Sequence, residues 1–216
     1  MKCPDCGLET KPLPCSSCVT EAARRESEME EVVREFSLVR GVPRSPELRR
    51  SLESAVTCVR KVGQGRWTVS FRKEDVLMSD RWWYIPHTWI GCMGFIVDRG
   101  SGYVNWLGSA SLRTLGDCFW GHDHGLVCDL VDFTFGQETD RALAARLLTR
   151  FHHMHPNAQG KLPRWAIPYR DSEIPAALAK QFPIFRRHHV WLAIPEIREA
   201  YEKGELRFTC SLSADR

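Results

Sequence analysis

Hydrophobic residues recur at helical spacing in the first third of the chain. Apolar positions at steps of three and four residues predict an amphipathic helix over residues 19–40. The sequence "GVPRSP" interrupts this pattern, and Ser45 followed by Pro46 suits the N-cap and first turn of a second helix. After "GQG" the period changes to two in "RWTVSFR", which predicts a half-buried strand over residues 66–72.

Short strands and helices follow one another through the rest of the chain. "WWYI" and "GLVCDLVDFTF" are typical of strands, "GFIVDRGSGYVNWLGSA" of a hairpin with a glycine turn, and "ETDRALAARLLTRF" of an amphipathic helix. The last part predicts strands over 165–169, 188–194 and 205–210 and helices over 172–182 and 195–204. Because no regular βαβ alternation appears, we predict an α+β fold with helices packed on a mostly antiparallel sheet. The expected regions are a cysteine module 1–18, a helical segment 19–62 and an α+β domain 63–216.

Composition is that of an ordinary globular protein of the cytoplasm. Hydrophobic residues make up 43% of the chain and charged residues 26%. No apolar run approaches the ~18 residues of a membrane span, and no apolar segment follows the first lysine, so we expect neither a membrane partner nor a secretory signal. The nine cysteines are odd in number and four of them have metal-ligand spacing, which favours a reducing compartment.

Two C-x-x-C pairs lie within the first 18 residues. In "CPDCGLETKPLPCSSC" each pair offers two thiolates from one tight turn, and four thiolates can surround Zn²⁺ tetrahedrally. The expected zinc ligands are Cys3, Cys6, Cys15 and Cys18. The segment resembles the short zinc-ribbon modules at the ends of many bacterial proteins, with Val19 where these usually have glycine. A redox role for the two pairs is the alternative.

Charge gives no support to a nucleic-acid partner. The formal net charge of +3 falls to about +1 if four thiolates hold one zinc ion. Nucleic-acid-binding domains concentrate basic residues on one face, whereas the cysteine module carries Lys2 and Lys11 without arginine or aromatic residues. Because so short a module cannot bury a core, we expect the metal to serve mainly its folding.

The hairpin region resembles a known family. In "GFIVDRGSGYVNWLGSASL" the residues that carry the resemblance are Gly94, Ile96, Val97, Asp98, Gly102, Val104, Leu107, Gly108, Ser109 and Ala110. They match the core pattern of the immunity protein 35 (YrhB-like) family, and the match covers about twenty residues. The resemblance implies a small cytoplasmic α+β protein that neutralises a toxin by binding it. It transfers no functional residues to this chain.

Tryptophan is abundant, and "RWWYIPHTW" concentrates Trp82, Trp83 and Trp89 within nine positions. Adjacent residues on a strand point to opposite faces of the sheet, so Trp82 and Trp83 cannot both enter one core. We expect one of them at a second core, at an interface or in a groove. Since aromatic side chains dominate the energetics of many interfaces, these tryptophans are the candidate partner-binding residues.

A second group of metal-ligating or nucleophilic residues lies in "CFWGHDHGLVC". It contains Cys118, His122, His124 and Cys128. The group predicts an ordinary polar loop, with two alternatives: a second metal site, or a nucleophilic Cys118 with a histidine as its base. "FHHMH" (His152, His153, His155) is expected at a helix C-terminus, where imidazoles interact favourably with the helix dipole.

These observations favour a binding protein over an enzyme. We expect a zinc-containing protein that binds another protein, with an immunity or antitoxin function against a toxin as its specific form. The first alternative is a peptidase-like or transglutaminase-like thiol enzyme that uses Cys118 with His122 or His124. The second is a zinc-ribbon protein that binds nucleic acid.

Overall fold

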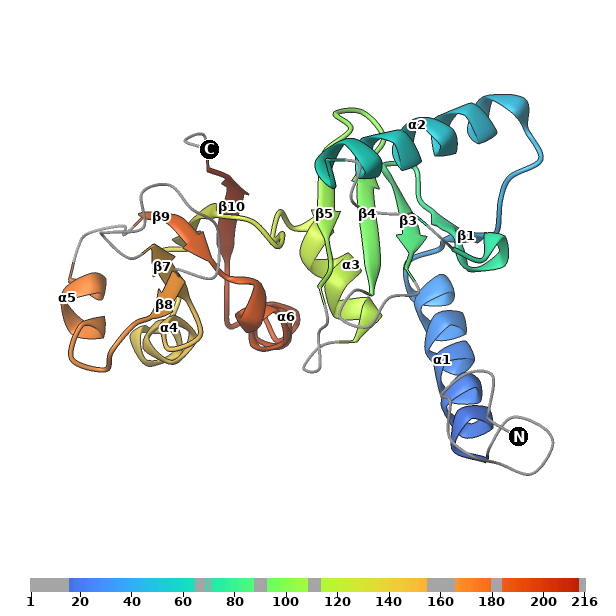
Figure 1. The fold of residues 1–216 in the computed structure, drawn as a ribbon. Helices are drawn as coiled ribbons and strands as arrows, with labels where there is room; N and C mark the ends of the chain where they lie inside the picture. Colours follow the sequence, from blue (N-terminus) through green and yellow to red (C-terminus); the bar gives the residue numbers. More distant parts are fainter. Residues whose placement is uncertain are drawn as a thin grey trace.

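The computed structural model describes residues 16–64, 69, 71–87, 93–108, 114–154, 166–179 and 184–213 (Figure 1). Its α-helices are α1 (Ser16–Glu35), α2 (Pro46–Val62), α3 (Leu115–Asp123), α4 (Arg141–Leu148), α5 (Ile174–Leu178) and α6 (Ile194–Glu202). Its strands are β1 (Val39–Arg40), β2 (Leu77–Met78), β3 (Trp82–Pro86), β4 (Gly94–Asp98), β5 (Val104–Trp106), β6 (Val131–Phe135), β7 (His152–Met154), β8 (Ala166–Pro168), β9 (Ile184–His189) and β10 (Phe208–Leu212). Short 3-10 helices lie at Lys73–Asp75 and Trp191–Ala193. The fold is a mixture of helices and antiparallel sheet, as the sequence predicts.

The strands form two five-stranded sheets instead of the single sheet that we expected. The first sheet has the order β1-β2-β3-β4-β5 and the second the order β10-β6-β9-β7-β8, and the strand pairs in both are antiparallel. In Figure 1 the first sheet lies beside α2 and α1, while the second lies with α4, α5 and α6. The connection from α3 to β6 leads from one sheet to the other.

The central strands β3 and β4 of the first sheet are buried on both faces. One face packs against α2 through a cluster that includes Leu52, Val59, Trp83 and Phe95. The other face belongs to the larger core, in which Trp82, Tyr84 and Ile96 pack with residues of α1 and α3. Covering both faces removes apolar surface from water on each side of the strands. The boundary that we expect at residue 62, between the helical segment and the α+β domain, therefore separates α2 from the sheet that α2 covers.

The larger core continues from the first sheet into the second. Its aromatic centre in the second sheet consists of Phe133, Phe135, Phe151 and Phe185, with Phe208 stacked on Phe133 at 5.1 Å between ring centroids. Helices α3 and α6 join the two parts. A Cβ at Gly121 of α3 would lie 2.6 Å from the Ile194 side chain of α6, so the close approach of these helices depends on glycine at this position.

The hairpin and the second helix are confirmed. β4 pairs with β5, and the turn between them is held by Asp98 Oδ1, which accepts hydrogen bonds from the backbone N–H groups of Gly100 (3.0 Å) and Ser101 (2.6 Å). Gly102 has φ +71°, a conformation that glycine adopts without strain. α2 begins with Ser45 at the N-cap and Pro46 in the first turn.

The first helix is shorter at its C-terminus than expected. α1 ends at Glu35 because Ser37 adopts a left-handed conformation (φ +51°). The N–H of Leu38 donates to Val33 O (2.9 Å) and that of Ser37 to Arg34 O (3.4 Å), which is the hydrogen-bond pattern of a Schellman C-cap. The left-handed position of this cap is usually glycine, so a serine at residue 37 does not predict it. The chain then enters β1.

Two further expectations were wrong. Residues 152–154 form strand β7, and α4 ends at Leu148, so His152 and His153 do not lie at a helix C-terminus. The strand expected over 188–194 lies earlier, as β9. Trp191–Ala193 is a helical turn that leads into α6. Its residues Trp191 and Ala193 are buried, and buried apolar residues occur in helical turns as well as in strands. Most of the strand expected over 66–72 lies outside the described residues.

Among the described helices, none combines the length and the apolar character that a membrane span requires.

Candidate functional site

Residues 118–123 of the segment "CFWGHDHGLVC" are helical, which corrects our expectation of a loop for this part, while residues 124–128 follow the helix. Thr114 caps α3: its hydroxyl accepts from the Asp117 N–H at 3.2 Å, while the Asp117 carboxylate accepts from the Thr114 N–H at 3.2 Å. Such a capping box satisfies two backbone donors that the helix leaves unpaired. Cys118 and His122 are therefore one helical turn apart on α3, and His124 follows its last turn.

The four side chains of this segment have separate surroundings. Cys118 is fully buried in the larger core. His124 stacks on Trp120 at 4.1 Å between ring centroids, and its Nδ1 lies 2.8 Å from the Trp120 carbonyl oxygen. In the part of the chain that the structure describes, no three histidine, cysteine or acidic side chains are placed to hold one metal ion. A nucleophilic role for Cys118 would require access that its burial denies.

His122 lies at the sheet side of α3 in a mostly buried position. Burial lowers its pKa to about 4, although the charges of Asp123 and Asp98 act in the opposite direction. Its Nδ1 lies 3.4 Å from the side-chain amide nitrogen of Asn105, and its ring meets Trp82 edge-on at 6.2 Å. A histidine with this pKa is neutral at pH 7.

Asn105 connects this helix with a thiol–imidazole pair. It is buried on β5, with 1% of its surface exposed, and its Oδ1 accepts a hydrogen bond from the Cys128 N–H at 2.8 Å. The Sγ of Cys128 lies 4.0 Å from Nε2 of His189, the last residue of β9. Both residues are partly exposed. We name Asn105, Cys128 and His189 the junction cluster. Asn105 belongs to the first sheet, Cys128 to the connection between the sheets and His189 to the second sheet.

Sequence reasoning missed two members of this cluster. The sequence marks Cys128 as a candidate, but its partner His189 lies 61 residues further along the chain, in a segment that the sequence predicts only to be a strand. Asn105 lies within the predicted hairpin, and its sequence context does not mark it as functional. No local spacing signals such a group, because the two sheets bring it together.

Other histidines meet across the second sheet. His153 on β7 pairs with His188 on β9, and His152 with His189, so neighbouring residues point to opposite faces. Tyr169 is hydrogen bonded through its hydroxyl to Nε2 of His188 at 2.6 Å, and its ring lies 4.6 Å from that of His153. His188 is 7% exposed, so this group belongs to the interior of the second sheet.

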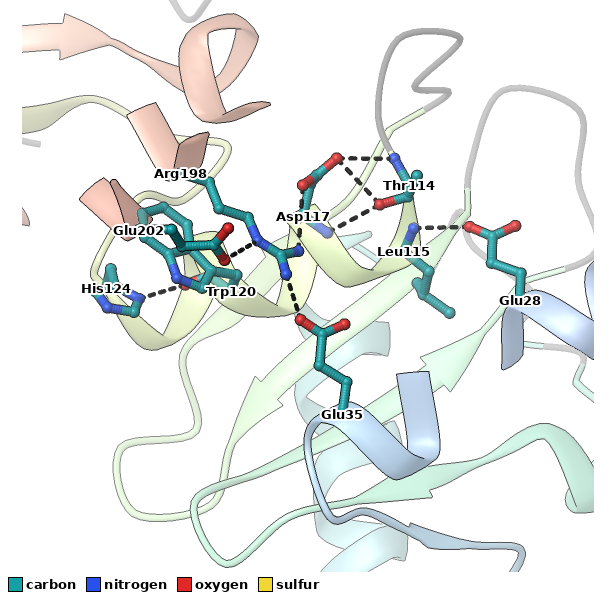
Figure 2. Close-up of polar contacts among 9 residues, drawn as sticks. All are labelled: Glu28, Glu35, Thr114, Leu115, Asp117, Trp120, His124, Arg198 and Glu202. Carbon is teal, nitrogen blue, oxygen red and sulfur yellow. Dashed lines mark hydrogen bonds and ion pairs between the residues drawn. The ribbon is translucent and has the colours of Figure 1, made fainter. Parts of the chain in front are cut away.

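Arg198 of α6 forms an ion-pair hub (Figure 2). Its guanidinium group contacts Glu202 on its own helix (2.8 Å), Asp117 of α3 (3.3 Å) and Glu35 of α1. A second contact joins α1 to α3, since Glu28 Oε1 accepts from the Leu115 N–H at 2.9 Å. These contacts fix α1, the helix whose first turn includes Cys18, against both α3 and α6.

Both neighbouring tryptophans are buried, so neither offers an exposed indole to a partner. Trp82 is 1% exposed and Trp83 is 0% exposed. Of the three expected positions, the second core is the observed one: Trp83 lies under α2 and Trp82 lies against α3. Trp89 lies outside the described residues. Sequence reasoning overlooked Trp106, which is 45% exposed on β5 at the end of the first sheet.

The zinc expectation also falls largely outside the described residues. Cys3, Cys6 and Cys15 are not described, and the structure gives only the backbone of Cys18, within the first turn of α1. No family model, curated protein or solved structure matches this chain. The resemblances to zinc ribbons and to the immunity protein 35 family therefore stay predictions.

Proposed function

We propose that the protein is a cytoplasmic, non-catalytic binding factor that takes up a protein partner, a toxin in the immunity interpretation, at the edge strand β5. The observation that carries the proposal is Trp106, a large aromatic side chain that is 45% exposed on a strand at the end of its sheet. An edge strand offers backbone hydrogen-bonding groups to an extended segment of a partner, and an exposed indole offers apolar contact area.

The surroundings of Trp106 support this proposal. Within the described residues, β5 pairs with β4 alone, opposite Phe95 at the position of Trp106. The neighbouring Asn105 is buried and bonded to the Cys128 backbone, so the strand is anchored from its inner side. A rigid strand loses little conformational entropy when a partner adds to it. β5 is also part of the hairpin that resembles the immunity family.

Substitution of Trp106 tests the proposal. The full-length chain serves as bait in extracts of its native host, and the captured protein is then purified and titrated against each variant. We expect Trp106→Ala to weaken that complex by about 30-fold or more, the effect of losing an interface hot spot of ~2 kcal/mol. Trp106→Lys should weaken it further, because a lysine on an edge strand opposes strand addition.

Ile167→Ala is the matched control, since Ile167 is a 37% exposed apolar residue on β8, an edge strand of the second sheet. The Ile167→Ala variant should bind the partner with the same affinity as the unmodified chain. A complex that tolerates both Trp106 variants would refute binding at β5. If the partner is a toxin, co-expression should also restore the growth of cells that produce it, and growth inhibition that persists would exclude the immunity function.

The cofactor belongs to the same proposal. We expect the purified full-length chain to contain one zinc ion, held by Cys3, Cys6, Cys15 and Cys18. Metal analysis of a Cys3→Ser, Cys6→Ser variant should find the zinc lost, because two thiolates cannot complete a tetrahedral site. Full zinc content in that variant would contradict the ligand assignment, and two zinc ions in the unmodified chain would point to a second site.

A further inference from the structure

The junction cluster places a thiol against an imidazole at the meeting point of the two sheets. Cys128 Sγ lies 4.0 Å from His189 Nε2, at the outer limit for a hydrogen bond that involves sulfur. Both residues are partly exposed. A neighbouring imidazole is one of the surroundings that convert a cysteine into the reactive thiolate form.

The polypeptide holds this pair in place from three elements. The Cys128 backbone is bonded to the buried Asn105 side chain of β5. His189 ends β9, where its backbone is paired with that of His152 on β7. Burial lowers the pKa of His152, which disfavours a positive charge on this neighbouring imidazole.

We propose that Cys128 is a nucleophilic thiol, activated by His189, and that it is a site of oxidation by hydrogen peroxide. The thiol proton passes from Sγ to Nε2 of His189, and the thiolate then attacks one peroxide oxygen. A sulfur–oxygen bond forms as the oxygen–oxygen bond breaks. The departing hydroxide takes the proton from His189, so the products are a sulfenic acid at Cys128 and one molecule of water. Peroxide is small enough for a thiol that is only partly exposed.

Cys118 and Cys210 lie in surroundings that oppose this chemistry, and Cys58 provides the comparison. Cys118 has no exposed surface. Burial and the nearby charge of Asp132 raise the pKa of Cys210 to about 12, so that thiol stays protonated at neutral pH. Cys58 on α2 is partly exposed and lies close to the hairpin turn, where a Cβ at Gly102 would be 3.2 Å from its Sγ. It therefore serves as the internal control.

Peroxide treatment of the full-length chain at pH 7, with dimedone to trap sulfenic acid and mass spectrometry of the peptides, tests the proposal. We expect the label at Cys128 ahead of Cys58. His189→Gln, which keeps a polar side chain but cannot take up a proton, should slow labelling of Cys128 by about tenfold and move the midpoint of its pH profile upward, toward the value of about 8.5 for an ordinary cysteine. His152→Gln should leave the rate within about twofold.

Two results would overturn the proposal. One is equal labelling rates and pH profiles for the unmodified chain and the His189→Gln variant. The other is labelling of Cys58 that matches or precedes that of Cys128 in the unmodified chain. The second comparison needs no substitution, so it decides the question even if a variant fails to fold, which a thermal melt of each protein establishes. Neither result depends on binding at β5.

Discussion

Replacement of Trp82 or Trp83 by alanine is expected to lower the free energy of unfolding by about 3–5 kcal/mol in each case. The two indoles fill separate cores on opposite faces of the first sheet, and each truncation leaves a large cavity. Each also loses a hydrogen bond, from Trp82 Nε1 to Asp123 Oδ1 (2.8 Å) or from Trp83 Nε1 to Ser51 Oγ (3.0 Å). The expected loss is similar for both, because both side chains are fully enclosed.

Denaturant titration of the single variants measures this effect. Trp106→Ala is the matched control, since it removes the same side chain from a half-exposed position of the same sheet and should change stability by only about 0.5 kcal/mol. A Trp82 or Trp83 variant that unfolds at the same denaturant concentration as this control would contradict the two-core arrangement.

Acidification is expected to destabilise the fold through His122. Its pKa is about 4 in the folded chain and about 6.5 in the unfolded chain, so between these values the unfolded state binds more protons. Stability is therefore retained above pH 6.5 and falls progressively as the pH drops toward 4. The shift corresponds to about 2–3 kcal/mol, allowing for partial solvent screening of a side chain that is not fully enclosed.

The difference between two pH series isolates this contribution. Unfolding free energies of the unmodified chain and of His122→Gln are measured from pH 7 to pH 4, where glutamine cannot titrate. We expect the two curves to converge as the pH falls, since the penalty for protonation affects only the unmodified chain. Curves that stay parallel would show that His122 does not lie in the surroundings described above. Burial lowers the pKa of His152 as well, but this effect is common to both series.

Local chemistry made part of the fold predictable. The hairpin follows from two apolar runs around glycines, and the start of α2 from a serine and proline at adjacent positions. The end of α1 was not predictable, because Ser37 adopts the left-handed conformation that usually requires glycine. Likewise, the apolar residues after His189 predict a strand, but they form a helical turn. A short buried apolar run fits either structure, so its sequence does not distinguish them.

The candidate sites show a different limit. The sequence predicts Cys118 as a candidate nucleophile or metal ligand, because two histidines lie close to it along the chain. In the structure, α3 buries this thiol in the core. The thiol–imidazole contact at Cys128 depends on His189, and their proximity is set by the packing of two sheets through α3 and α6. Spacing along the chain carries no information on such a contact. The exposure of Trp106 is equally a consequence of strand order.

The contact between Glu35 and Arg198 spans 163 positions of the chain. A ribosome adds about 5–20 residues per second, so the interval between the synthesis of these two residues is roughly 10–30 s. Until Arg198 is made, the carboxylates of Glu35 and Asp117 lack the guanidinium group that joins them, and the apolar side of α1 lacks the α6 part of its core. Completion of the fold therefore waits until α6, close to the end of the chain, has left the ribosome. A nascent chain stalled before α6 should depend on chaperones for its solubility.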